Sequence, residues 1–227
     1  MGTVLLYDID GTLVTTDGGA RQALLDTIIA HYGDDAGFDF GFGGMTDRGI
    51  FRRGLVQRGV AVEEDLLDRL IADYLPRLES VLARAAVHRL LPGALEMVRA
   101  SVGWSGVVAG LGTGNVEAGA RMKLRPFAVD ALLPFGGFGC DAELRAELIA
   151  AGHRRGAARL GLPVEQTRLV VVGDTVHDIE AARANGGVTL AVATGRTSHE
   201  ALVAGGAEVV VHRLDDVGAI AALARLC

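Results

Sequence analysis

The chain is poor in cysteine, proline and aromatic residues, and each shortage argues against a class of protein. Of 227 residues, 2 are cysteine, 5 are proline and 5% are aromatic. Cys140 and Cys227 lack the spacing of a metal site, so we expect free thiols in a reducing cytoplasm. No apolar stretch approaches the roughly 20 residues that span a bilayer. Asp8 interrupts the short apolar run near the N-terminus, so we expect no signal peptide.

Positive charge is scarce relative to negative charge. Lysine and arginine together number 22, against 28 aspartates and glutamates, which gives a formal net charge of -6. This balance predicts no general affinity for nucleic acid or for an anionic membrane. We expect a small-molecule partner and a chain that is a monomer or a homodimer.

Apolar runs alternate with helix-like segments over most of the chain, which predicts an α/β fold. Half of the residues are hydrophobic and 32 are glycine, as expected for buried strands joined to helices by tight turns. Such alternation is typical of a Rossmann-like parallel sheet with helices on both faces. The predicted strands are residues 3–7, 106–111, 168–172, 188–193 and 207–211. The predicted helices of this part are residues 93–101, 115–125, 142–160, 176–185 and 215–226.

Residues 15–88 interrupt this alternation, because their apolar positions recur with helical spacing. The expected helices are residues 20–31, 47–59, 63–74 and 76–86, and a glycine-rich loop is expected near 34–46. We therefore predict an inserted α-helical cap domain at 15–88. The remaining residues, 1–14 and 89–227, would form the α/β catalytic core.

Polar turns follow three of the predicted strands. Residues 8–12 read DIDGT, residues 113–115 read TGN, and residues 173–178 read GDTVHD. Ligands of open parallel sheets bind at the carboxyl ends of the strands, so we expect four carboxylates to meet there. Carboxylates so close repel one another unless a hard cation such as Mg²⁺ lies among them. The four are Asp8, Asp10, Asp174 and Asp178.

Such a carboxylate cluster, with Mg²⁺, a hydroxyl and a basic residue, suits phosphoryl transfer. Each aspartate taken alone could instead have a purely structural role, since an aspartate at a strand end is often only a helix N-cap. The joint occurrence of four aspartates at two strand ends favours the catalytic interpretation.

The same turns carry a family resemblance. YDIDGTL resembles the first motif of the haloacid-dehalogenase-like superfamily, Thr113 after an apolar strand resembles the second, and GDTVHDIEAARANG resembles the fourth. The order and spacing are similar along nearly the whole chain. The resemblance is greatest to phosphoglycolate-phosphatase-like members that carry a helical cap between the first and second motifs.

The resemblance implies a Mg²⁺-dependent phosphatase that acts on a small phosphorylated metabolite. Asp8 would be the nucleophile and form an aspartyl-phosphate, and Asp10 would be the general acid and base. Mg²⁺ would be held by Asp8, the Asp10 carbonyl and Asp174, with Asp178 binding directly or orienting waters. The acid at position 10 argues against a dehalogenase, because a halide needs no proton. The phosphoryl oxygens would be held by Thr113 and by the 8–10 and 113–115 turns, which include Ile9, Gly114 and Asn115.

The third motif departs from the family pattern, because the chain has no Lys-Pro pair before the fourth motif. Arg145 stands 32 residues after Thr113 and 29 before Asp174, and Lys123 is the only lysine in the chain. Either side chain would shield the negative charge of the nucleophile and phosphate. The spacing favours Arg145, and Lys123 remains the alternative.

The helical insert is expected to close over the site as a lid and to select the substrate. Within it, the stretch GGMTDR at 43–48 places hydrogen-bonding groups beside two glycines, so Thr46 and Arg48 are candidate substrate-binding residues. Alternatively, Thr46 or Asp47 only caps the helix that follows. Two rival functions stay open at this point: a phosphomutase with the same motifs, and a non-catalytic binding module on the same fold.

Overall fold

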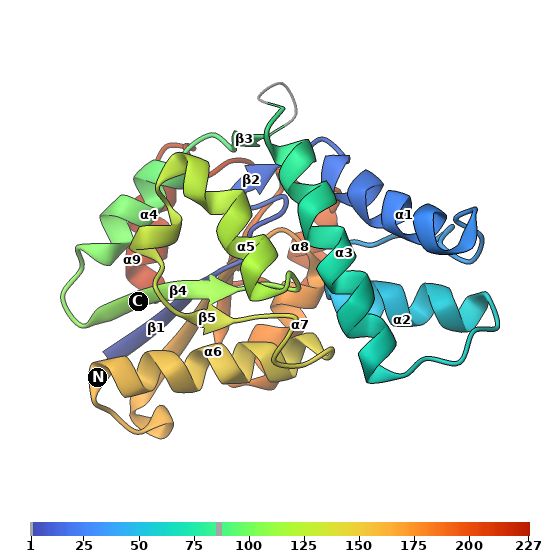
Figure 1. Cartoon of the computed structure of the whole chain (residues 1–227). Helices are drawn as coiled ribbons and strands as arrows, with labels where there is room; N and C mark the ends of the chain where they lie inside the picture. Colours follow the sequence, from blue (N-terminus) through green and yellow to red (C-terminus); the bar gives the residue numbers. More distant parts are fainter. Residues whose placement is uncertain (1, 85–87) are drawn as a thin grey trace.

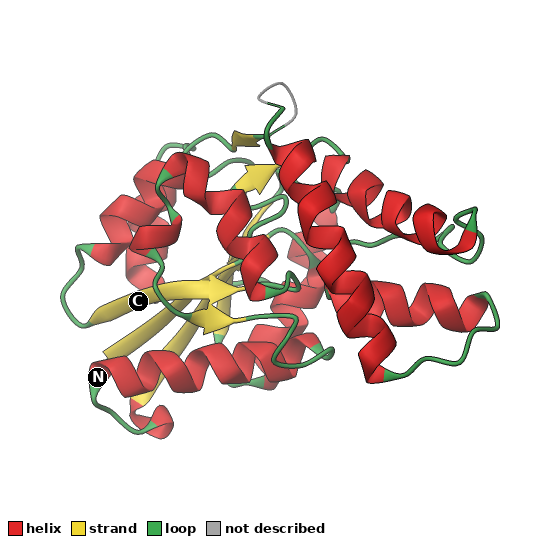
Figure 2. Ribbon diagram, in the orientation of Figure 1, coloured by secondary structure: helices red, strands yellow, loops and turns green. Residues whose placement is uncertain are grey.

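The computed structural model describes residues 2–84 and 88–227. Within these residues, six strands form one sheet in the order β5-β4-β1-β6-β7-β8, and every neighbouring pair is parallel. Helices lie in front of this sheet and behind it (Figure 2). The predicted Rossmann-like α/β fold is therefore confirmed. The strands are β1 (Gly2–Tyr7), β4 (Val107–Gly112), β5 (Gly136–Gly137), β6 (Thr167–Gly173), β7 (Val188–Val192) and β8 (Val209–Val211).

The central strand β1 is apolar on both sides, which explains why its sequence shows no alternation of polar residues. Leu5 and Tyr7 join one buried cluster, and Val4 and Leu6 join another. The first cluster is completed by α4 (Ala94–Val102), α5 (Glu117–Leu124) and α9 (Ala219–Leu226). The second is completed by α6 (Arg145–Leu160) and α7 (Val176–Ala184), and α8 (His199–Gly205) packs beside α7.

The insert between β1 and β4 is helical and has its own apolar cluster. It contains α1 (Gly19–Tyr32), α2 (Asp47–Gln57) and α3 (Glu64–Leu82), which lie at the right of Figure 1, beside the sheet. The chain leaves and re-enters the core through a short antiparallel pair, β2 (Val14–Thr15) with β3 (Arg89–Leu90). Strands of two residues are too short to show any periodicity, so neither was predicted.

The two helices predicted at 63–74 and 76–86 are one helix, α3, which contains Pro76. Proline removes one backbone donor and usually ends a helix. Here the apolar face continues across it, since Tyr74 and Leu78 are both buried in the insert. Packing of this face outweighs the lost hydrogen bond. The helix ends at Leu82, and predicted positions 85 and 86 lie outside the described residues.

Other differences from the predicted elements are small. The helix predicted at 142–160 begins at Arg145, and the one predicted at 115–125 ends at Leu124. The strand β5 consists of two glycines and was not predicted. Short 3₁₀ turns also escaped prediction; they are Arg125–Phe127, Asp130–Leu132 and Val164–Gln166.

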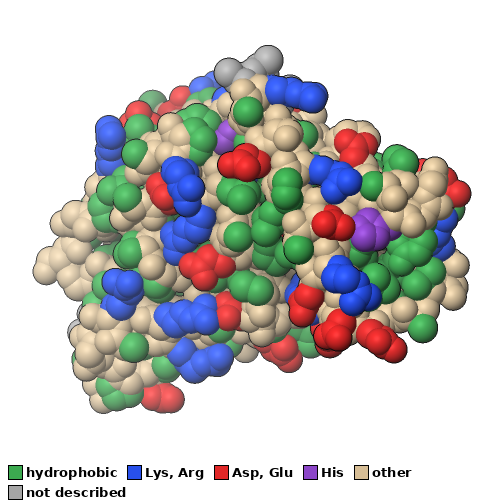
Figure 3. All heavy atoms as spheres, in the orientation of Figure 1, with side chains coloured by type: hydrophobic (Ala, Val, Ile, Leu, Met, Phe, Trp, Pro, Cys, Tyr) green, Lys and Arg blue, Asp and Glu red, His purple; other side chains and the backbone are tan. Residues whose placement is uncertain are grey.

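The surface of the described residues agrees with the mixed charge of the sequence. Figure 3 shows acidic and basic side chains interspersed over the face that it presents. Among the helices in the described part of the chain, none has the length and apolar character needed to cross a membrane.

Candidate active site

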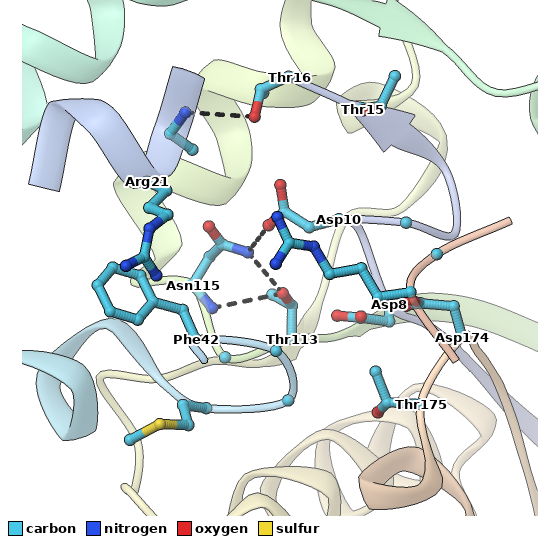
Figure 4. A pocket seen from close by; sticks show the side chains of 18 of the residues that line it. Asp8, Asp10, Thr15, Thr16, Arg21, Phe42, Thr113, Asn115, Asp174 and Thr175 are labelled. Atoms are coloured by element: carbon cyan, nitrogen blue, oxygen red, sulfur yellow. Dashed lines mark hydrogen bonds between the residues drawn. The ribbon is translucent and has the colours of Figure 1, made fainter. Parts of the chain in front are cut away.

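The carboxyl ends of the central strands meet at one edge of the sheet. β1 and β6 run in parallel register with Tyr7 opposite Val172, and β4 lies on the other side of β1. The Asp8 N–H extends this pairing by donating to the Val172 carbonyl at 2.9 Å. The turns that carry Asp8, Thr113 and Asp174 therefore surround one point (Figure 4).

Three aspartates form a buried acidic cluster. One carboxylate oxygen from each of Asp8, Asp174 and Asp178 lies within 4.8 Å of the others. Burial raises the pKa of Asp8 to about 6, a shift that Arg145 opposes and Asp178 reinforces. Burial and the nearby Asp8 charge hold the pKa of Asp174 well above its usual range. The cluster thus concentrates more negative charge than a buried site favours.

Arg145 is the basic residue that contacts this cluster. It is the first residue of α6, and one guanidinium nitrogen lies 3.0 Å from an Asp8 oxygen and 2.5 Å from an Asp178 oxygen. Burial opposes its charge, yet Asp178 and Asp8 together raise the pKa of Arg145. Of the two candidates for a cation beside Asp8, the structure therefore places Arg145 there and Lys123 elsewhere.

Asp178 is held in the first turn of α7. Its second oxygen accepts hydrogen bonds from the Thr175 N–H at 3.0 Å and from the Thr175 hydroxyl at 2.7 Å, in a capping box at the start of α7. Because its first oxygen contacts Arg145, both oxygens already have partners. Asp178 therefore orients Arg145 and α7, and Asp8 and Asp174 offer the better-placed oxygens for a cation.

The Asp10 carboxylate does not join the cluster, contrary to the expectation that four carboxylates meet at one point. Its oxygens accept hydrogen bonds from the Lys123 ammonium, at 2.8 and 2.6 Å, and from the Asn115 amide, at 2.7 Å. Burial acts to raise the pKa of Asp10, but the Lys123 charge and these hydrogen bonds outweigh it and lower the pKa.

Lys123 is buried where the insert meets the core. It lies on α5, only 2% exposed, and also donates to the Asn115 side-chain oxygen at 2.6 Å. The neighbouring Met122 packs against the insert cluster, while Leu124 belongs to the core cluster. Because α5 packs against both the insert and the core, the Lys123 ammonium lies beside Asp10. The sequence spacing of Lys123 and Asp10 did not indicate this contact.

A cavity of about 590 Å³ lies beside these groups, with walls from both the core and the insert. The core wall includes Asp8, Asp10, Thr113, Asn115, Arg145 and Asp174. The insert wall includes Arg21, Leu24, Phe42, Met45, Asp47 and Tyr74. Sequence reasoning missed most of the insert wall, because these residues come from separate segments and meet only when the helices pack.

The loop before α2 docks directly on the core. The Asp47 N–H donates to the Gly114 carbonyl at 2.9 Å, and the Asp47 carboxylate accepts from the Val116 N–H at 2.9 Å. A Cβ at Gly114 would lie 2.3 Å from the Met45 carbonyl oxygen, so this approach requires glycine. The insert is therefore closed against the core in this structure.

Two of the predicted substrate-binding residues are committed to other contacts. The Thr46 hydroxyl accepts a hydrogen bond from the Gly49 N–H and caps α2, which is the alternative role that we considered for it. Arg48 points to acidic residues of α3, Glu64 and Asp68. Neither lines the cavity, so the expectation that they bind substrate is not supported.

The residues of the second turn line the cavity, and those of the first turn do so in part. The Gly114 and Asn115 residues line the cavity beside Thr113, and the Thr113 hydroxyl accepts a hydrogen bond from the Asn115 amide at 2.8 Å. The Ile9 side chain is fully buried, and only its backbone faces the turn around Asp8.

The residues of the acidic cluster suit a hard divalent cation. The donor set consists only of oxygens, which Mg²⁺ prefers. Burial and, to a lesser extent, mutual repulsion raise the pKa of both Asp8 and Asp174, and a bound cation would favour their ionised forms. Glycines keep the space around Asp174 open. A Cβ at Gly11, whose φ is 85°, would lie 2.5 Å from an Asp174 oxygen, and one at Gly195 would lie 1.6 Å from it.

Comparisons with known proteins agree with this arrangement. A family model described as haloacid dehalogenase-like hydrolase matches residues 3–186. A search of curated proteins gave no match. Among solved structures, a hydrolase from Pseudomonas syringae is 18% identical, with a TM-score of 0.69 and 99% of each chain covered.

Two further structures are similar over nearly their whole length. CbbY from Rhodobacter sphaeroides, in complex with phosphate, is 18% identical with a TM-score of 0.72, covering 96% of this chain and 97% of that one. A predicted phosphoglycolate phosphatase from Haemophilus somnus 129pt is 16% identical with a TM-score of 0.68, covering 97% and 98%. At these identities the likeness establishes the fold.

Proposed function

Because the chain belongs to the haloacid dehalogenase-like hydrolase family, we propose that it hydrolyses phosphate monoesters of small metabolites, with Asp8 as the nucleophile. The observation that carries this proposal is the position of the Asp8 carboxylate. It lines the cavity, contacts Arg145 and lies in the cluster with Asp174. Membership of a hydrolase family also disfavours a non-catalytic binding module.

The reaction would proceed in two halves. An Asp8 oxygen attacks phosphorus in line, the bond to the leaving oxygen breaks, and Asp10 donates a proton to that oxygen. The products of this half are the free alcohol and an aspartyl-phosphate. A water then attacks phosphorus and gives its proton to Asp10, which releases inorganic phosphate and restores the Asp8 carboxylate. Arg145 offsets the negative charge that builds up between nucleophile and phosphate.

Lys123 and Asn115 would set the position of Asp10. Their hydrogen bonds fix its carboxylate on the cavity wall, and the ammonium keeps it ionised, which is the form that accepts a proton from water. The first half needs the protonated form. The Lys123 contact must therefore weaken when a leaving group occupies the cavity.

Phosphoryl oxygens would be held by donors of the two turns. The Thr113 hydroxyl accepts from the Asn115 amide, which leaves its own proton for a phosphoryl oxygen. The backbone N–H groups of Ile9 and Gly114 would supply further donors.

Mg²⁺ would be held by the side chains of Asp8 and Asp174 and by the Asp10 carbonyl, with Asp178 orienting the site through Arg145. When bound, it would supply the positive charge that lets an anionic nucleophile approach an anionic phosphate.

Residues 15–88 would act as a cap domain on a core made of 1–14 and 89–227. The β2–β3 pair lies at the crossing points, so it would serve as the hinge. The loop at Met45 and Asp47 contacts the Gly114 turn in the closed state. Opening of this contact would admit substrate and release product.

The test is release of inorganic phosphate from a panel of phosphate monoesters, with Mg²⁺, with Ca²⁺ and with a chelator. We expect turnover with Mg²⁺, less with Ca²⁺ because its longer, more numerous bonds loosen the geometry, and none with chelator. Full activity in chelator would contradict the metal assignment. A phosphomutase would instead isomerise a sugar phosphate, require a bisphosphate activator and release little phosphate.

A further inference from the structure

Arg21 is a cavity-lining cation that the proposed mechanism does not use. It lies on α1, and its guanidinium donates to the Phe40 carbonyl at 3.0 Å and to the Phe38 carbonyl at 3.2 Å. The same group stacks over the Phe42 ring, 3.9 Å from its centre. Two carbonyls and a ring therefore fix its position before any ligand binds.

The charge of Arg21 lacks an acidic partner among the described residues. Other insert arginines do have acidic partners: Arg48 pairs with Glu64 and Asp68, and Arg58 pairs with Asp34. The two buried cations on the cavity wall are also paired, Lys123 with Asp10 and Arg145 with Asp8, whereas Arg21 is half-buried. Within residues 2–84 and 88–227, no carboxylate comes within ion-pair distance of Arg21.

Arg21 also keeps donors free for a ligand. A guanidinium has five N–H groups, and the two carbonyls occupy one on each terminal nitrogen. The remaining donors suit an anion with two adjacent oxygens, which arginine binds in bidentate fashion.

The acids nearest to the cavity do not supply this partner. Asp17, which also lines it, is paired with Arg89, and Asp47 is bound to the Val116 N–H. Arg196 lines the cavity as well, but it is exposed and has no anchoring contact among the described residues. It also follows β7 next to Gly195, which borders Asp174 and therefore the phosphoryl end.

Figure 4 shows where Arg21 lies relative to the reacting groups. Asp8 and Asp174 are at the right of the view, Arg21 and Phe42 are at the left, and Thr113 and Asn115 lie between them. A molecule whose phosphate is at Asp8 would thus extend past Asn115 towards Arg21.

We propose that Arg21, stacked on Phe42, binds a second anionic group on the alcohol part of the substrate. This inference rests on the proposed phosphatase function and narrows its substrate class to phosphate monoesters whose alcohol ends in a carboxylate or a second phosphate. Arg21 is then a specificity-determining residue that touches the leaving group and takes no part in the chemistry at phosphorus.

The experiment uses four esters of equal chain length with Mg²⁺. They are butyl phosphate, 4-phosphonooxybutanamide, 4-phosphonooxybutanoate and butane-1,4-diol bisphosphate. The first two carry a neutral end, the third a carboxylate and the fourth a second phosphate. The variants are Arg21→Gln and, as a matched control, Arg53→Gln. Arg53 also stacks on a phenylalanine of the same loop, with its guanidinium 4.3 Å from the Phe40 ring centre, but it does not line the cavity.

In the unsubstituted chain we expect kcat/KM for at least one anionic ester to exceed that for the amide by about tenfold or more, the scale of one charge-assisted interaction. Arg21→Gln should reduce this ratio towards 1, and Arg53→Gln should keep it. The third and fourth esters distinguish a carboxylate subsite from a phosphate subsite. Because Asp8→Asn should not hydrolyse the esters, calorimetry on this variant measures their dissociation constants. The preference for the anionic ester over the amide should appear in these constants as well, and adding Arg21→Gln should reduce it.

Two results would overturn the inference. The first is a ratio near 1 in the unsubstituted chain. The second is a ratio that survives in Arg21→Gln; if it survives with an equal loss for all four esters, Arg21 only supports the fold of the insert. Absence of phosphate release from every ester by the unsubstituted chain would instead refute the proposed function, so the two failures are distinguishable.

Discussion

The two ends of the cavity carry opposite charge imbalances. At the core end, Asp174 accepts a hydrogen bond from Thr12 but has no basic partner in an ion pair among the described residues. At the insert end, Arg21 is anchored by carbonyls and a ring but has no acidic partner among the same residues. An unbalanced carboxylate calls for a metal cation, and an unbalanced guanidinium calls for an anion.

The ends also differ in what holds them. The core end is fixed by hydrogen bonds of β1, β4 and β6 and by short turns after each strand. The insert end depends on packing between α1, α2 and α3 and on the contact between Asp47 and the Gly114 turn. This difference separates chemistry from selection: changes at the core end should affect every ester, and changes at the insert end should affect their ranking.

The largest effect is expected from Asp8→Asn. Asparagine is nearly isosteric but is not a nucleophile for phosphorus, so kcat should fall by about 10³-fold or more for neutral and anionic esters alike. The measurement is phosphate release from purified protein whose melting temperature and circular dichroism match the parent. More than a tenth of the original kcat in such a protein would remove Asp8 from the nucleophile role.

Arg145→Ala should be next. It leaves the buried carboxylates of Asp8 and Asp178 without their cation, so kcat should fall by about 10²-fold or more, and stability by about 3–5 kcal/mol. Urea unfolding and kinetics with all four esters measure both effects. The control is Arg154→Ala, an exposed position on the same helix. Equal behaviour of the two variants would mean that the cation beside the nucleophile has no electrostatic role.

Lys123→Met should have a smaller and more selective effect. Without the ammonium, the pKa of Asp10 should rise, which favours the protonated form, but Asp10 also loses two hydrogen bonds and its fixed orientation. We expect the lost orientation to outweigh the easier protonation, so proton donation to the leaving oxygen should weaken. Butyl phosphate has a poor leaving group and should lose about tenfold or more in kcat/KM, within the range of general acid catalysis. p-Nitrophenyl phosphate needs little protonation and should lose less. Equal losses for both esters would argue that Lys123 only supports the packing of α5.

The smallest effect is expected from Asp47→Asn and concerns stability. Burial raises the pKa of Asp47 to about 6, with Lys123 opposing and Asp10 reinforcing the shift. Tyr74, on α3, is the other titratable group that senses this carboxylate. A raised carboxyl pKa means that the folded state binds the proton more tightly, so the cost of ionising Asp47 appears as pH rises from about 4 and is complete above about 6.

Asparagine keeps an oxygen for the Val116 N–H but cannot ionise. Relative to Asp47→Asn, the unsubstituted chain should therefore lose about 1–3 kcal/mol of unfolding free energy between pH 4 and pH 7. Urea unfolding of both proteins at several pH values measures this difference. A constant difference across that range would show that Asp47 has an ordinary pKa and that the docked loop is more open to water.

Much of the core end was predictable because its chemistry is local in sequence. Each motif follows a buried apolar strand within one or two residues, and parallel strands bring their carboxyl ends to the same edge. The capping box of Thr175 and Asp178 spans only four residues. Even so, the prediction that the Asp10 carboxylate joins the other three was wrong. The direction of a side chain depends on its neighbours, and here Lys123 and Asn115 bind the Asp10 carboxylate.

The insert end was poorly predictable because its residues share no motif. Thr46 and Arg48 looked suitable beside two glycines, yet one caps α2 and the other pairs with α3. Arg21 and Phe42 gave no signal, since an arginine on a helix is ordinarily a solvated residue and their contact spans 21 positions of sequence. Pro76 was also misleading: we expected a helix to end before it, but tertiary packing lets α3 continue through this proline.

The sequence by itself determined the family and the parallel α/β sheet, and it indicated the candidate residues for attack, protonation and cation binding. Hydrophobic runs and the short turns after them suffice for this, because the physics of strand burial and strand ends acts over a few residues. Only the tertiary structure decided which cation faces Asp8, which one faces Asp10, and that Arg21 faces the cavity. These outcomes depend on how helices far apart in the chain pack together. Burial, ion pairing and loop docking all change with that packing, so no local stretch of sequence specifies them.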